Sequence, residues 1–202
     1  MTQPEKYGVR GLSSTATWDE RLVGKVRQAA VMVLISGDEA DRRILFTQRA
    51  QGISQAGHVS FPGGGREGEE NPEQTALRET QEEIGLDPDD IRVWGRLPAR
   101  MASRLHVDPV AVVGQWSGDH RLLQPNTVEV ERILDVPVKE LANPAARVTW
   151  ELSHGHSGPG FLVDGVFIWG MTAGIADALL ELCGWAQQWD HERRVPVPPE
   201  FR

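Results

Sequence analysis

The sequence predicts an α+β domain, or a mixed α/β/α sandwich, rather than a regularly wound βαβ fold. Apolar runs of strand length come first, one amphipathic helical segment interrupts them, and a second helical segment follows a further series of strands. A chain of 202 residues, 40% of them hydrophobic, suits one domain. We expect this domain at residues 26–190, between a loosely structured lead-in at 1–25 and a Pro-rich, extended tail at 191–202.

Strands are expected where apolar and β-branched residues run together between turn residues. Segments 27–36 and 42–50 form a first hairpin, and a short strand near 58–61 ends at a proline and three glycines. A second hairpin over 160–170 turns at Asp164-Gly165, a strong turn signal. Helices are expected at 71–84 and 171–190, with a helical turn at 139–144. The remaining strands are expected at 91–99, 107–116, 127–138 and 148–152.

The composition limits the classes of partner. Twenty-nine acidic and 21 basic residues give a net charge of −8, so a broad basic face for nucleic acid is not expected. The single cysteine, Cys183, excludes an internal disulfide and Cys-rich metal sites, and it fits the cytoplasmic location that we expect. The first residues lack the apolar core of a signal peptide, and no apolar run approaches the roughly 18–20 residues of a membrane span.

Residues 64–86 concentrate acidic charge, with seven glutamates against two arginines. The helix within this segment has clear boundaries. Asn71 is a good N-cap, Pro72 takes the first helical position, Gln74 can complete a capping box, and Gly85 suits a left-handed C-cap. Like charges at neighbouring positions of such a helix are destabilising unless a counter-charge is present.

Helical spacing places the carboxylates of Glu79, Glu82 and Glu83 on one arc. A different arc, formed by Ala76, Leu77, Thr80 and Ile84, can pack on a sheet. Arg78 lies one turn before Glu82 and can hold one carboxylate. A hard divalent cation such as Mg²⁺ or Mn²⁺ would relieve the repulsion among the rest. The alternative is a solvated acidic helix face, and the glycines before the helix, which permit close approach of a ligand, favour the metal site.

The same residues resemble the Nudix box, G-x5-E-x7-R-E-U-x-E-E-x-G-U, in which U is a bulky aliphatic residue. The matching positions are Gly64, Glu70, Arg78, Glu79, Glu82, Glu83, Gly85 and Leu86. Thr80 stands where an aliphatic residue is usual, and its shape is close to that of valine. Eight fixed positions over 23 residues make a specific signal.

The resemblance implies a Nudix fold, an α/β/α sandwich around a mixed sheet, and hydrolysis of a nucleoside diphosphate linkage with Mg²⁺ or Mn²⁺. It implies metal ligands at Glu79, Glu82 and Glu83, with the Gly64 carbonyl as a further one. It also implies orienting roles for Glu70 and Arg78. The cation would neutralise an acidic substrate, polarise phosphorus and activate a water.

Residues 45–64 are similar to the signature of the coenzyme A pyrophosphatase branch of this superfamily. The resemblance implies substrate contacts from Arg49, Gly63 and Gly64, and cleavage of coenzyme A or an acyl derivative to 3′,5′-ADP and 4′-phosphopantetheine. His58 stands where glutamine is usual in the branch; its place next to the glycines makes it a further candidate for substrate contact, and the alternative is a structural loop histidine. The loop departs from the branch pattern at 52–55, where Gly-Ile-Ser-Gln replaces a basic residue. Two residues remain candidates for the general base, Glu82 and, outside the box, Glu129, which matches a later glutamate of the branch.

Three functions remain open at this stage. The first is a coenzyme A diphosphatase, the second an ADP-ribose or other nucleoside-diphosphate pyrophosphatase, and the third a nucleotide-sensing Nudix domain without activity. The complete set of box carboxylates argues against the third. The expected partner is a small nucleotide, with no nucleic acid and no membrane; a homodimer is expected only from the general habit of soluble enzymes.

Overall fold

The computed structural model describes residues 28–98 and 109–201, together with residues 4, 9, 11–13 and 18 of the lead-in. The other lead-in residues lie outside the described part, and so do the adjoining ends of two predicted strands. Arg100 and Arg104, which could replace the basic residue that the loop lacks at 52–55, lie outside it as well. Across the described residues, no helix combines the length and the apolar character that crossing a membrane requires.

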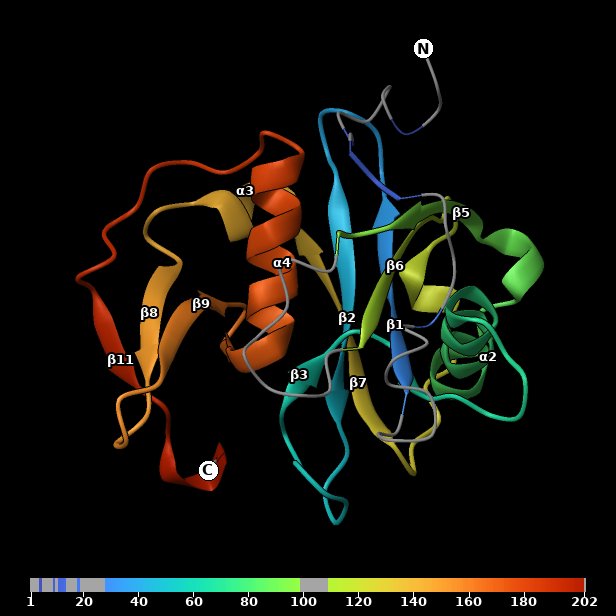
Figure 1. Ribbon diagram of the computed structural model, residues 1–202, viewed down its shortest axis with the longest axis horizontal. Helices are drawn as coiled ribbons and strands as arrows, with labels where there is room; N and C mark the ends of the chain where they lie inside the picture. Colours follow the sequence, from blue (N-terminus) through green and yellow to red (C-terminus); the bar gives the residue numbers. More distant parts are fainter. Residues whose placement is uncertain are drawn as a thin grey trace.

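A mixed sheet forms the centre of the molecule (Figure 1). In the described residues it has seven strands, with the order β3-β2-β1-β6-β5; β4 also pairs with β1, and β7 with β2. Among the described strands of this sheet, β1 and β6 form the only parallel pair, and the β1–β2 hairpin has the antiparallel pairing that the sequence predicts. The strands are β1 (Ala29–Ser36), β2 (Arg43–Arg49), β3 (Val59–Ser60), β4 (Gly63–Gly65), β5 (Arg92–Arg96), β6 (Val110–Gln115) and β7 (Val130–Pro137).

Both faces of this sheet are covered. Figure 1 shows helix α2 (Pro72–Ile84) on one side and helix α4 (Gly170–Leu182) on the other. Alternate residues of β1 enter the two cores, since Met32 and Leu34 pack with the α2 side whereas Val33 and Ile35 pack with the α4 side. The predicted α/β/α sandwich around a mixed sheet is therefore confirmed.

A second sheet lies beyond α4, which the sequence did not predict (Figure 1). In the described residues it has four strands, in the order β10-β9-β8-β11. The predicted hairpin is present, with Asp164 and Gly165 at its turn in left-handed conformations. The strands are β8 (Arg147–Glu151), β9 (Ser157–Val163), β10 (Val166–Ile168) and β11 (Arg194–Pro196), and the short helices of the fold are α3 (Val138–Ala142), η1 (Pro88–Asp90), η3 (His120–Leu122) and η4 (Pro199–Phe201).

The last long helix is shorter than predicted. It ends at Leu182, not at residue 190, because Gly184 adopts a left-handed conformation with a φ of 68° that an α-helix cannot continue. Trp185 and Trp189, which the predicted helix would have carried one turn apart, therefore lie beyond its end. Cys183 caps the helix end and is buried.

The C-terminal residues pack against the domain. β11 pairs in parallel with β8, and Val197, which is fully buried, donates a backbone hydrogen bond to the carbonyl of Glu151 at 3.0 Å. η4 follows and brings Phe201 close to the connection between β2 and β3. The predicted extended segment thus contributes a strand to the second sheet.

Candidate active site

Helix α2 presents the acidic residues, and its ends are as predicted. The side chain of Asn71 accepts from the backbone N–H of Gln74, and the Gln74 side chain accepts from the N–H of Asn71, which completes the capping box. Gly85 closes the helix with a φ of 69°. Thr80 is fully buried and donates to the Ala76 carbonyl, so the one departure from the Nudix pattern lies on the packing face.

Arg78 connects the carboxylates of this region. Its Nε donates to Glu70 at 2.8 Å, and its Nη1 donates to Glu79 at 3.1 Å and to Glu82 at 2.9 Å. Its Nη2 donates to the Gly65 carbonyl at 2.8 Å, which ties α2 to β4. These bonds lower the pKa of Glu70 to about 2 and raise that of Arg78. Arg78 therefore fixes the relative positions of three carboxylates.

Glu83 is the buried carboxylate of the site, with 4% of its surface exposed. Burial raises its pKa to about 8, and the nearby Glu79 and Glu129 add to the rise. The backbone N–H of Gly63, which donates to it at 3.3 Å, and the charge of Arg49 act in the opposite direction. Since these two effects do not offset the effect of burial, the protein alone stabilises the ionised form of Glu83 less than water does.

Glu79 lies against the glycine strand β4. A Cβ on Gly64 would stand 2.4–2.6 Å from the three atoms of the Glu79 carboxyl group, so only glycine leaves room for this side chain. A Cβ on Gly63 would stand 2.4 Å from the backbone oxygen of Ala30. Burial raises the pKa of Glu79 as well, with Arg78 opposing the rise. The glycines therefore permit close approach of β1, β4 and the carboxylates of α2.

The donor set fits a divalent cation shared with a substrate. In the described residues, no three His, Cys, Asp or Glu side chains converge to form a metal site by themselves. Glu79 and Glu83, one helical turn apart, both have raised pKa values, which a cation between them would lower. Mg²⁺ is commonly held by one or two carboxylates together with water and substrate phosphates. Glu82 is more exposed and bonds to Arg78.

Glu129 reaches the site from a turn, not from a strand. The strand predicted over 127–138 begins only at Val130. The backbone N–H of Glu129 donates to the Asn126 carbonyl, and the N–H of Asn126 donates to the Glu83 carbonyl at 2.8 Å, so the turn docks on the end of α2. The charge of Glu129 adds to the rise in the pKa of both Glu79 and Glu83, and its backbone carbonyl accepts from the N–H of Ala50 at 2.8 Å, which joins the turn to the β2–β3 loop.

Arg49 and His58 stand at the two ends of the β2–β3 loop. The N–H of Arg49 donates to the His58 carbonyl at 2.9 Å, and its Nε donates to the Ser54 carbonyl at 3.0 Å. The His58 ring lies against Trp169 and Phe201, at centroid distances of 5.4 and 5.0 Å. Burial lowers the pKa of His58, and Arg49 lowers it further. Arg49 is thus the member of this pair whose charge acts on Glu83.

Sequence reasoning missed one residue of the site. Trp18 donates through Nε1 to the Glu70 carbonyl at 2.6 Å, and the guanidinium of Arg66 lies 5.7 Å from the centre of its ring. The contact joins residues 52 positions apart, and no local pattern in the sequence indicates it.

Comparisons with known proteins agree with this geometry. A family model described as the NUDIX domain matches residues 26–154, more than half of the chain. Human mitochondrial coenzyme A diphosphatase NUDT8 is 32% identical over 170 residues, which cover 80% of this chain and 72% of that protein. Mitochondrial Nudix hydrolase 15 of Arabidopsis thaliana is 32% identical over 164 residues, 75% of this chain but only 56% of the plant protein. Among solved structures, the Nudix hydrolase RenU of M. Smegmatis matches with a TM-score of 0.54 at 18% identity, covering 78% of this chain and 86% of RenU, and thus supports the fold. The chain therefore belongs to the Nudix hydrolase superfamily, and the resemblance to its coenzyme A pyrophosphatase-like branch is confirmed.

Proposed function

We propose that the protein is a metal-dependent diphosphatase that hydrolyses coenzyme A or acyl-coenzyme A to 3′,5′-ADP and 4′-phosphopantetheine. The observation that carries the substrate class is the similarity to the human coenzyme A diphosphatase over 80% of this chain. The arrangement of Glu79 and Glu83 beside the glycine strand supports the reaction class.

Glu79 and Glu83 would hold Mg²⁺ or Mn²⁺, with the Gly64 carbonyl and Glu82 as further candidate ligands. When bound, the cation would neutralise the diphosphate and make water more acidic. Arg78 holds Glu79 and Glu82 in place while Glu70 holds Arg78.

We assign the role of general base to Glu129. Glu82 already accepts a hydrogen bond from Arg78, whereas Glu129 stands on the turn that docks on the end of α2, and its charge acts on Glu79 and Glu83. In the proposed step, water attacks one phosphorus atom, its proton passes to Glu129, and the bond from that phosphorus to the bridging oxygen breaks. The bridging oxygen leaves as part of the second phosphate product.

Arg49 would bind the 3′-phosphate of coenzyme A. Its charge reaches the site, and the loop that follows it carries no other arginine or lysine between residues 50 and 58. This same lack of a second basic residue favours the runner-up function, an ADP-ribose or related nucleoside-diphosphate pyrophosphatase, because such substrates lack the 3′-phosphate. Cytoplasmic location, a homodimer and the absence of nucleic-acid binding remain predictions, and the human relative is named as mitochondrial.

Product analysis tests the proposal. The purified protein is incubated with Mg²⁺ or Mn²⁺ and, in parallel, coenzyme A, dephospho-coenzyme A, ADP-ribose and NADH, with Glu83→Gln as the control. Release of 3′,5′-ADP with strong preference for coenzyme A over dephospho-coenzyme A supports the assignment. Equal cleavage of the two, or preference for ADP-ribose, refutes the substrate. Nucleotide binding without cleavage by either protein would instead indicate a sensing domain.

A further inference from the structure

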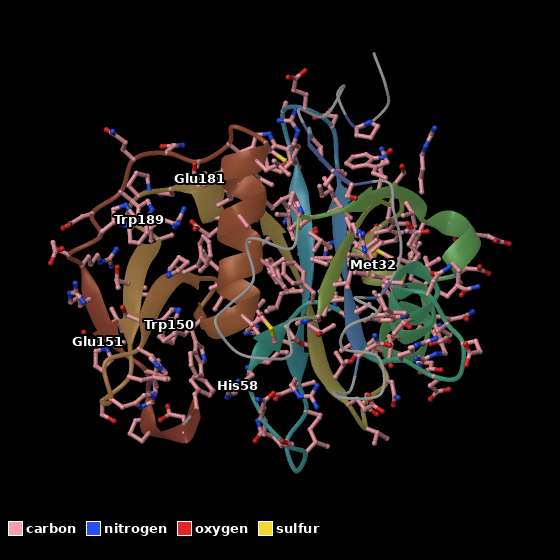
Figure 2. The ribbon with its side chains drawn as sticks, viewed as in Figure 1. Met32, His58, Trp150, Glu151, Glu181 and Trp189 are labelled. Atoms are coloured by element: carbon pink, nitrogen blue, oxygen red, sulfur yellow. The ribbon has the colours of Figure 1, made fainter. Side chains whose placement is uncertain are left out.

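The β2–β3 loop packs against the C-terminal end of the chain. The rings of His58 and Phe201 lie 5.0 Å apart and almost perpendicular, at 86°. A Cβ built on Gly57 would touch Cε1 of Phe201 at 3.4 Å. Trp169, which also contacts the His58 ring, contacts Trp150 at a centroid distance of 5.7 Å. Figure 2 labels His58 and Trp150 in the lower half of the view. The loop therefore rests on an aromatic cluster built from distant parts of the chain.

One residue of the loop, Gln55, adopts a backbone conformation that residues with a side chain do not favour. Gly52 and Gly57 have φ angles of 86° and 76°, and Gln55, which has a side chain, has a φ of 58°. A left-handed conformation at a residue other than glycine costs free energy and persists where surrounding contacts enforce it. The carbonyl of Gln55 accepts a hydrogen bond from the backbone N–H of His58 at 3.1 Å, and the His58 ring in turn contacts Phe201.

The loop conformation also determines where Arg49 lies. The N–H of Gly57 donates to the Arg49 carbonyl at 3.0 Å, the N–H of Arg49 donates to the His58 carbonyl, and Nε of Arg49 donates to the Ser54 carbonyl. Both the backbone and the guanidinium of Arg49 are thus bonded to loop residues. Since the charge of Arg49 acts on Glu83, a change in the loop would move positive charge relative to the carboxylates.

We propose that Phe201, acting through His58, is a positioning residue that holds the β2–β3 loop and thereby orients Arg49 toward the anionic substrate. The proposal rests on the proposed function for the identity of the substrate. It gives the C-terminal segment a role in substrate affinity: β11 and Val197 anchor the segment to the second sheet, and η4 carries the aromatic contact to the loop. Phe201 itself is not a catalytic residue.

Three variants test the proposal: Phe201→Ala removes the ring, Phe201→Tyr keeps it, and Glu200→Ala is the matched control at an exposed position of the same turn. We expect Phe201→Ala to raise KM for coenzyme A about threefold to tenfold, the range expected for loss of an aromatic contact, with kcat nearly unchanged. Phe201→Tyr and Glu200→Ala should both behave like the wild type. A fall in kcat with unchanged KM, or a failure of tyrosine to restore KM, would overturn the proposal.

Hydrogen exchange separates this proposal from the proposed function, because it needs no substrate. In Phe201→Ala, amides of residues 50–58 should exchange about tenfold faster, while those of β8 and β9 stay protected. Unchanged exchange in the loop would overturn the proposal, and faster exchange throughout the second sheet would show a general loss of structure instead. If the wild type cleaves no diphosphate, the proposed function fails, and the exchange rates together with the calorimetric affinity for coenzyme A decide the role of Phe201.

Discussion

Replacing Glu70 by glutamine should remove an ion pair while preserving the size of the side chain. Glu70 accepts from Nε and Nη2 of Arg78, at 2.8 and 3.2 Å, and from the hydroxyl of Thr75 at 3.0 Å. A glutamine can accept with its single amide oxygen, but its NH₂ group cannot face the guanidinium. The substitution therefore loses one charge-assisted bond and weakens another.

The structure gives the size and the pH dependence of the loss. The pKa of Glu70 falls from 4.5 to about 2, chiefly through the hydrogen bond from Arg78. The difference, 4.5 minus 2, corresponds to a ceiling of about 3.4 kcal/mol at pH 7. Each side chain of the pair is about one-fifth exposed, so we expect solvent screening to leave about 2 kcal/mol. Because the folded pKa is depressed, this stabilisation is present above pH 4.5 and is lost as the pH falls toward 2.

Urea unfolding of both proteins at pH 7, 5 and 3.5 measures this contribution. The difference in unfolding free energy should be about 2 kcal/mol at pH 7 and about 1 kcal/mol smaller at pH 3.5, since the unfolded wild type has then bound a proton that the folded state has not. Glu69→Gln is the matched control, since the Glu69 side chain is fully exposed, and it should show no such change. A difference that stays constant from pH 7 to pH 3.5 would refute the reasoning.

Three further predictions concern the glycine strand, the second sheet and the base. Gly64→Ala should lower kcat about tenfold or more with little loss of stability, because the new Cβ displaces the flexible carboxylate of Glu79. Gly63→Ala should lower the free energy of unfolding in urea by about 2 kcal/mol, because its Cβ would collide with the backbone oxygen of Ala30. Arg147 of β8, which is fully buried, donates through Nη2 to the carboxylate of Asp177 on α4. Asp177→Asn should destabilise by about 3 kcal/mol and more than Arg147→Met, because only the first leaves the buried guanidinium without its counter-charge; equal melting temperatures would contradict this. Glu129→Gln should lower kcat about 100-fold at saturating metal, and near wild-type kinetics would dismiss it as the base.

The acidic helix was predictable because its signals are local. Asn71, Pro72 and Gln74 at the start and Gly85 at the end each act within a few residues of the helix terminus, and all four have the predicted roles. The long strands β1, β2 and β6 of the central sheet were predictable for a similar reason, since burial on both faces requires the continuous apolar runs that the sequence shows. The glycine strand β4 has no apolar residue and was not predicted as a strand.

Features that depend on distant contacts were not predictable in this way. The pairing of β11 with β8 joins segments more than 40 positions apart, and nothing within either segment specifies its partner. The end of α4 is a different case, because the apolar spacing continues through Trp185 while the conformation of Gly184 stops the helix. Substrate contact by His58 stays a prediction, and its ring contacts with Trp169 and Phe201, more than 100 residues further along the chain, could not be predicted from the local sequence.

Arg78 supplies the counter-charge for part of the acidic segment. Arg78 serves Glu70, Glu79 and Glu82, and it lies N-terminal to Glu82 by one helical turn, so the sequence alone could indicate part of this role. Glu83, the most buried carboxylate of the set, receives no hydrogen bond from Arg78 among the interactions of the described residues, and its pKa is about 8. A buried acid without a nearby counter-charge is costly for folding, and such groups concentrate at functional sites. Arg78 thus stabilises the charge of Glu70 and positions Glu79 and Glu82, whereas the protein leaves the charge of Glu83 largely uncompensated.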